Sequence, residues 1–226
     1  MTVLEHLAEL RRRIIIVGIG ASVAVVIAAF WLTWPMITLL SEPAGVKLAA
    51  LRPAEMFSTY MKVALATGVG LAMPLIVSQL LLFVLPGLHP YERRWIYIGV
   101  PAITFAFAVG LAFGFFLVIP FAVRFLMSFG GDIVEAVWSV EAYLSFVSSL
   151  LLWIGLSFET PIALFFLAKL GVVNARQLAR YRRYALVGAF IIGAIITPTP
   201  DPVNQTIVSV PIYLLYELGV LLARFA

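Results

Sequence analysis

One carboxylate interrupts an otherwise apolar stretch, and its position requires a chemical explanation. Glu159 lies near the middle of residues 146–167, FVSSLLLWIGLSFETPIALFFL, and is followed directly by Thr160 and Pro161. The length and apolarity of this stretch predict a membrane-spanning helix. A charged side chain near the centre of a bilayer costs about 2.5–3.5 kcal/mol on insertion scales. We therefore expect Glu159 to face the interior of a helix bundle or a wet cavity.

Two interpretations of Glu159 follow from this position. The carboxyl group could be a polar point in a cavity that meets a substrate or partner, or a neutral group hydrogen-bonded to a neighbouring helix. We favour the first, because acids at membrane depth usually serve a function. Pro161 has no N–H, so the carbonyl of Ser157 loses its helical partner and we expect a bend there.

The composition indicates one polytopic membrane domain. The chain has 226 residues, of which 63% are hydrophobic and 12% charged, whereas a soluble domain averages about 25% charged residues. The absence of cysteine excludes disulfides and thiolate chemistry, and the two histidines form no HExxH pattern. We therefore expect no metal, no cofactor and no catalytic group. We attribute the net charge of +4 to membrane topology rather than to nucleic-acid binding.

Apolar runs predict an all-α fold with six membrane spans. Residues 2–13 are expected to form a short amphipathic helix, and residues 35–60 and 120–142 to form outer loops. The predicted spans are residues 14–34, 61–85, 95–119, 143–168, 185–197 and 203–222.

The last two spans are predicted to be short. A helix over residues 185–197 covers only about 20 Å of a hydrocarbon core about 30 Å thick, and the apolar part of the final span begins only at Ile207. Either the turn that contains Asp201 lies sunken in a thinned membrane, or the two helices form a hairpin buried among the others. The sequence leaves both possibilities open.

The positive-inside rule places both termini in the cytoplasm, because eleven of the fifteen Lys and Arg residues then lie on that side. Outside the spans, this basic face carries only three acids, Glu5, Glu9 and Glu92. Two guanidinium groups of a cationic ligand could bind two such carboxylates in bidentate geometry. The alternative is structural. Glu9 could pair with Arg12 or Arg13 along its own helix, and the negative charge of Glu92 could interact favourably with the dipole of a helix that begins near it.

Several segments together resemble the TatC family of twin-arginine protein translocase subunits. The resemblance covers nearly the whole chain and rests on HLAELRRR (6–13), FVLPGLHPYERR (83–94), SFETP (157–161), RRYALVGAFIIGAIITPTPDPVNQT (182–206) and PIYLLYELGV (211–220). It implies six helices in a curved, glove-like arrangement with short helices 5 and 6. It also implies a receptor, rather than an enzyme, that binds twin-arginine signal peptides of folded cargo at the cytoplasmic face.

The resemblance further implies assembly with TatA- and TatB-like single-span subunits, self-association, and export driven by the proton-motive force across a bacterial or archaeal cytoplasmic (inner) membrane. It assigns pairing with the signal arginines to Glu92, supported by Glu9. It also implies roles for further residues: Phe83, Leu88, Arg93 and Arg94 around that site, Glu159 on the concave membrane face, Asp201 and Gln205 at the last turn, Pro43 in the first outer loop, and Arg11 in the N-terminal signature.

A small secondary transporter that uses Glu159 as a proton or cation site is the alternative function. Such transporters commonly show repeats with broken helices in corresponding positions. Short spans occur at only one end of this chain and no repeat is visible, so we prefer the receptor.

Overall fold

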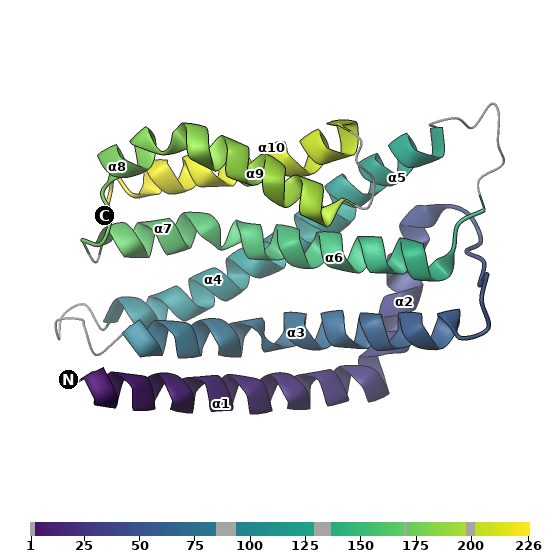
Figure 1. The fold of residues 1–226 in the computed structure, drawn as a ribbon, viewed down its shortest axis with the longest axis horizontal. Helices are drawn as coiled ribbons and strands as arrows, with labels where there is room; N and C mark the ends of the chain where they lie inside the picture. The colour runs from purple at the N-terminus through teal and green to yellow at the C-terminus, as the bar shows by residue number, and fades with distance from the viewer. Residues whose placement is uncertain (1–2, 85–93, 129–136, 170, 198–201) are drawn as a thin grey trace.

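The computed structural model describes residues 3–84, 94–128, 137–169, 171–197 and 202–226 (Figure 1). Regular structure in these segments is helical apart from one isolated parallel bridge between Ala49 and Ser139. The α-helices are α1 Val3–Ile27, α2 Thr33–Ser41, α3 Glu55–Val84, α4 Arg94–Phe113, α5 Ile119–Ser128, α6 Val140–Phe158, α7 Thr160–Lys169, α8 Ala175–Arg180, α9 Arg182–Ile196 and α10 Pro202–Leu222.

Five stretches in the described segments are long and apolar enough to cross a membrane. They have 40, 26, 31, 30 and 18 residues, the last being Gln205–Leu222 in α10. Helix α9 has only 15 residues. The prediction of an all-helical membrane protein whose last two helices are short is therefore confirmed.

The predicted outer loops begin too early in the sequence. The first helix does not end at residue 34 but continues to Ser41, and the third predicted span continues to Ser128. In both cases a five-residue π-helical turn, Ala28–Leu32 or Gly114–Val118, comes shortly before a proline, Pro35 or Pro120. Local π turns accommodate a proline inside a helix, so the helices continue through these prolines. Likewise, residues 2–13 form no separate helix, because α1 runs without a break from Val3 to Ile27.

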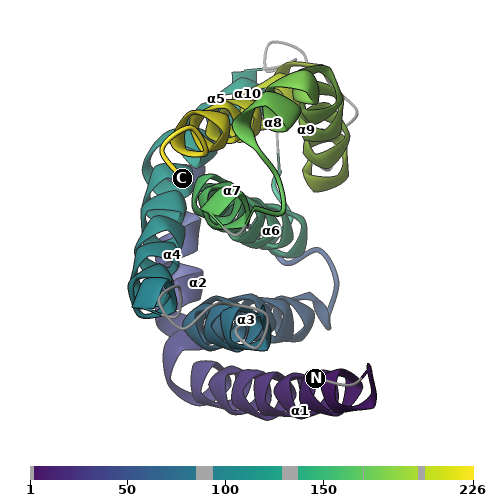
Figure 2. The same cartoon turned by 90° about the vertical axis from the view of Figure 1, so that its left-hand side faces the viewer.

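The helices form an open curve, which agrees with the predicted glove-like shape. Figure 2 shows the curve running from α1 through α3 and α4 to α10 and α9, with α6 and α7 inside it. Both termini lie at one end of the molecule, which we name the terminal end; the opposite end, where α3 and α6 begin, is the distal end (Figure 1).

The main core surrounds α6. Its side chains Leu144, Val147, Leu150 and Ile154 are buried against residues of α2, α3 and α5. Gly110 and Gly114 both face α6, and glycines four residues apart allow close helix packing. A Cβ atom at Gly110 would lie 2.9 Å from the Cα atom of Gly155, a distance that leaves no room for a side chain.

Gly110→Ala should therefore destabilise the protein by about 1–3 kcal/mol through overpacking. Thermal unfolding in detergent measures this change. Gly18→Ala is the matched control, because a Cβ atom there meets nothing within 4 Å. Equal melting temperatures for the two variants would contradict the close approach of α4 and α6.

Candidate functional site

Helices α1 and α3 pack antiparallel along their length, and this pairing builds the terminal end of the molecule. A Cβ atom at Gly68 would lie 2.5 Å from the Cα atom of Val25, so the two backbones touch there. Nearer the terminal end, Arg13 of α1 donates to Gln79 of α3 at 2.8 Å. Beyond this contact, still closer to the terminal end, the rings of His6 in α1 and Phe83 in α3 stack with their centroids 4.4 Å apart.

This pairing brings two predicted site residues, Glu9 and Phe83, to the same end of the α1–α3 pair. Glu9 is half-buried, with 19% of its side chain exposed. Its Oε1 accepts from Arg13 Nε at 2.7 Å and lies 2.6 Å from Arg13 Nη2. The structural alternative considered for Glu9, pairing with an arginine one turn along its helix, is therefore what the structure shows, with Arg13 as the partner.

Four of the predicted site residues, Leu88, Glu92, Arg93 and Asp201, lie outside the described residues. Arg94 is described only as the first residue of α4. Arg11 is exposed and lines a shallow hollow on α1 together with Arg12, Ala8, Ile15 and Ile16. The structure thus places Glu9 and Phe83 at one end, and the joint binding of the signal arginines by Glu9 and Glu92 stays a prediction.

Glu159 sits where the long helix breaks. Helix α6 ends at Phe158 and α7 begins at Thr160, so the helix is interrupted at Glu159, two residues before Pro161. The Glu159 N–H donates to the carbonyl of Leu156 at 3.1 Å. Among the described residues, its buried Oε1 atom has no hydrogen-bond partner. The interpretation in which Glu159 is hydrogen-bonded to a neighbouring helix therefore gains no support from the described part of the chain.

Gln205 joins the two short helices. Its Nε2 donates to the carbonyl of Phe190 in α9 at 2.9 Å, and a Cβ atom at Gly193 would lie 3.0 Å from the Gln205 carbonyl oxygen. The outer face of α9 remains exposed and, together with Gln205, lines an apolar hollow of about 500 Å³. The α9 residues that line this hollow are Leu186, Val187, Phe190, Ile191, Ala194 and Ile195. The α9–α10 pair is therefore not fully enclosed by the other described helices.

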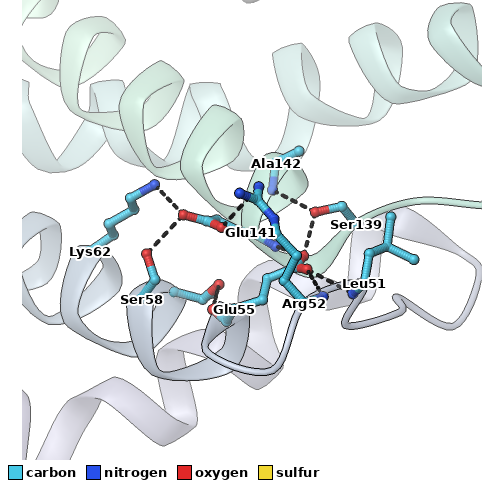
Figure 3. Close-up of polar contacts among 9 residues, drawn as sticks. Leu51, Arg52, Glu55, Ser58, Lys62, Ser139, Glu141 and Ala142 are labelled. Atoms are coloured by element: carbon cyan, nitrogen blue, oxygen red, sulfur yellow. Dashed lines mark hydrogen bonds and ion pairs between the residues drawn. The ribbon is translucent and has the colours of Figure 1, made fainter.

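Two carboxylates, Glu55 and Glu141, lie in one network of polar contacts at the distal end (Figure 3). Glu55 is 2% exposed. Its Oε2 accepts from the N–H groups of Leu51 at 2.7 Å and Arg52 at 3.0 Å. Its Oε1 accepts from Ser139 Oγ and from the Glu141 N–H. Glu55 therefore ties the start of α3 to the segment that enters α6.

Glu141 adds a second set of contacts to this network. It accepts from Ser58 Oγ at 2.8 Å and from Lys62 Nζ at 2.7 Å, both on α3. Nearby, Pro43 lies in a 3₁₀ turn, Glu42–Ala44, that ends at Gly45 with φ of 65°. Glu55 and Glu141 each lie in the first turn of a helix, where an acid is favourable whatever its other contacts. Their shared role depends on a contact between segments 86 residues apart, which no local pattern reveals.

No group of three His, Asp or Glu side chains in the described residues could hold a metal ion. Carboxylates in these segments pair with cations of the chain itself, as Glu9 does with Arg13 and Glu141 with Lys62.

Comparisons with known proteins agree with this architecture. The family model of the Sec-independent protein translocase protein (TatC) matches residues 5–211. A TatC protein of Carboxydothermus hydrogenoformans is 38% identical over 100% of this chain and 93% of its own length. One of Deinococcus radiodurans is 40% identical over 97% of this chain and 84% of its own length. A crystal structure described as the twin arginine translocase receptor TatC superposes with a TM-score of 0.89 at 35% identity, over 97% of this chain and 98% of that one.

The chain therefore belongs to the TatC family. It is a multi-pass membrane subunit of the twin-arginine translocase, a protein translocase component rather than an enzyme. These likenesses do not favour the small-solute transporter.

Glu55→Gln should destabilise the protein by about 1.5–3 kcal/mol, because it removes a charged acceptor and leaves some of the buried N–H and O–H donors without a hydrogen-bond partner. Thermal unfolding in detergent measures the effect. Glu42→Gln removes an exposed carboxylate from the same end and is the matched control. If both variants have the melting temperature of the wild type, the hydrogen bonds of Glu55 do not stabilise the distal end.

Proposed function

We propose that this subunit is the receptor for twin-arginine signal peptides and that Glu9 and Glu92 pair with the two signal arginines. The observation that carries the proposal is the geometry of Glu9. Its carboxylate is half-buried, fixed by the α1–α3 pairing, and already accepts two donors from one guanidinium group. Both nitrogens meet one oxygen, Oε1, and a planar guanidinium group can present two N–H donors in this way, whereas a lysine ammonium group is a compact point charge.

The surroundings of Glu9 fit an extended peptide that carries an apolar segment after its arginines. Phe83 lies at the same end, where its ring stacks on His6. We place Leu88, Arg93 and Arg94 beside this site, and Arg11 in the same basic segment of α1. The Lys and Arg distribution supports a cytoplasmic position for both termini, in a bacterial or archaeal cytoplasmic membrane.

The partner-binding surfaces are proposed on the short helices. The exposed apolar face of α9 suits the transmembrane helix of a TatA- or TatB-like single-span subunit. Gln205 contacts α9, and Asp201 directly precedes α10 in the sequence. Pro43 shapes the first distal loop, where subunits of the translocase could also associate with one another. Export by this assembly would draw on the proton-motive force.

The binding proposal predicts a preference that can be measured directly. The purified protein in detergent should bind a twin-arginine signal peptide more tightly than the same peptide with both arginines replaced by lysine. Glu9→Gln and Glu92→Gln should each weaken binding of the arginine peptide about tenfold or more, since each removes charge-assisted hydrogen bonds.

Glu42→Gln serves as the control for this assay, because it removes one exposed carboxylate at the distal end. Equal binding of the two peptides by folded wild-type protein, or undiminished binding by both glutamine variants, would refute the receptor proposal.

Glu159 is proposed to act after the arginines have bound, by contacting the apolar part of the signal at membrane depth. Its carboxyl group lies at the helix break, and its Oε1 has no hydrogen-bond partner in the described structure. Glu159→Leu should therefore leave the affinity for the arginine pair unchanged and reduce export of a folded cargo in cells. A variant that exports normally would remove Glu159 from the mechanism.

A further inference from the structure

A stretch with basic residues and no acid follows Glu159 in the sequence. From Thr160 to Pro200 the chain contains neither Asp nor Glu. The charged residues of this stretch are Lys169, Arg176, Arg180, Arg182 and Arg183. The four arginines lie in helix α8 or at the start of α9, at the terminal end of the molecule (Figure 1). This part of the terminal end therefore carries a concentrated positive charge.

Helix α8 is anchored on α10, which fixes where its arginines lie. Asn174 and Gln177 form a capping box at its start, in which each side chain accepts a hydrogen bond from the backbone N–H of the other. Leu178 is buried in a cluster with residues of α10, and its carbonyl accepts from the Tyr216 hydroxyl at 2.7 Å. Arg180, the last residue of α8, remains exposed.

The chain stays close to helical where α8 meets α9. The carbonyl of Tyr181 accepts from the N–H groups of Tyr184 at 3.0 Å and Ala185 at 2.9 Å. The rings of Tyr181 and Tyr184, three residues apart, lie with their centroids 5.9 Å apart. Arg180 and Arg183 have the same spacing, so they occupy neighbouring positions on this surface. We name the surface formed by Arg180, Tyr181, Arg183 and Tyr184 the basic corner.

Arg183 is oriented by an aromatic ring rather than by an acid. Its Cζ atom lies 4.9 Å from the centroid of the Tyr184 ring, and its Nη2 donates to the Tyr184 hydroxyl at 3.1 Å. Both side chains are exposed. A guanidinium group has several N–H donors, so most of those of Arg183 remain available to a ligand.

The positive charge of the basic corner is not neutralised within the described part of the chain. Arg182 pairs there with Glu217 at 2.8 Å, but neither Arg180 nor Arg183 forms an ion pair with a described carboxylate. Like charges at neighbouring helix positions destabilise each other. An anion bound by Arg180 and Arg183 together would relieve this repulsion.

The surface beside the basic corner indicates what kind of anion fits. Tyr181 and Tyr184 are 55% and 58% exposed, and tyrosine side chains are enriched at the headgroup level of membranes. Leu186 and Val187 follow directly, are exposed, and begin the apolar hollow on α9. A free phosphate ion would use only the arginines, whereas a phospholipid would also use the tyrosine rings and the apolar surface.

We infer that the basic corner binds the headgroup of an anionic phospholipid, with the phosphate on Arg180 and Arg183 and an acyl chain along the exposed side of α9. The planar fork of a guanidinium group matches phosphate oxygens. The acyl-chain position is open in the isolated subunit, before any single-span partner covers α9. This site does not involve Glu9, and the inference stands independently of the receptor proposal.

Native mass spectrometry of the full-length protein in detergent tests the inference. The protein is titrated with dioleoyl phosphatidylglycerol, which has a net negative charge, and separately with dioleoyl phosphatidylcholine, which has the same chains and a phosphate but no net charge. The wild type should bind phosphatidylglycerol more tightly. Arg180→Gln and Arg183→Gln should each weaken this binding about fivefold and change the binding of phosphatidylcholine little. Equal affinity of the wild type for the two lipids would overturn the inference.

Arg12→Gln is the matched control. It removes the same charge from an exposed arginine at the same end of the molecule, on α1, where the hollow that Arg12 lines contains no tyrosine. It should leave the affinity of the tightest-bound phosphatidylglycerol unchanged. A loss equal to that of Arg180→Gln would show that any positive charge at this end attracts the lipid, and would overturn the inference.

Tyr184→Leu separates a built site from charge alone. It keeps both arginines but removes the ring and the hydroxyl that orient Arg183. The affinity for phosphatidylglycerol should fall about two- to fivefold, as expected for the loss of an exposed cation–π contact. An unchanged affinity would contradict the basic corner as described.

Inorganic phosphate distinguishes a lipid site from a site for free anions. Added phosphate should displace phosphatidylglycerol no more than chloride does at the same ionic strength, since both screen charge equally. Stronger displacement by phosphate would mean that the corner binds free phosphate, and would overturn the lipid assignment.

Thermal unfolding supplies a second measurement and shows whether each variant is folded. Phosphatidylglycerol should raise the melting temperature of the wild type, because a ligand that binds the folded state stabilises it. The rise should be smaller in the double variant Arg180→Gln/Arg183→Gln. An equal rise in the folded double variant would place the lipid elsewhere on the protein and overturn the inference.

Discussion

The Glu55 carboxylate accepts hydrogen bonds from four donors that belong to two separate segments of the chain. Two of the donors precede α3, and the other two lie at the entrance to α6 (Figure 3). A buried carboxylate is costly unless its oxygens are satisfied, so the loops can adopt this arrangement only together. The parallel bridge between Ala49 and Ser139 extends the same junction. These contacts fix where α3 and α6 start relative to each other.

The position of the terminal end follows from that junction. Helix α3 has 30 residues and spans about 45 Å, so a fixed start also fixes where its last turns lie. Helix α1 then aligns on α3 through the close approach at Gly68, the contact between Arg13 and Gln79, and the stacking of His6 on Phe83. The Glu55 junction thus positions α3 against α6, and the α1–α3 contacts then set the position of Glu9 on α3.

Local sequence features were sufficient for much of this fold. Apolar runs predicted the membrane helices, and the missing N–H of Pro161 agrees with the interruption of the helix at Glu159. The ends of the helices were harder to predict. Prolines such as Pro35 and Pro120 are typical of helix ends, but each of these follows a π turn that allows the helix to continue. A proline signals a missing N–H, but it does not show whether the preceding turn can widen.

The sequence singled out individual candidate residues but few of the contacts that they make. Glu9 stood out as an acid on a basic face, and Arg13 was one of two possible partners. Gln79 was visible only as a polar residue in an apolar span, because its contact with Arg13 joins residues 66 apart. The same applies to Glu55 and Glu141, whose common role depends on segments that meet only in the folded chain.

The most direct test of the receptor account is the location of a bound signal peptide. A photo-crosslinking amino acid is placed at Phe83, at the terminal end, and at Phe57, an exposed aromatic residue near the distal start of α3. The account predicts that a twin-arginine peptide crosslinks at position 83 and not at 57, and that excess unlabelled arginine peptide abolishes the crosslink while the lysine peptide does not. Crosslinks of equal yield at both positions, or competition by both peptides alike, would contradict it.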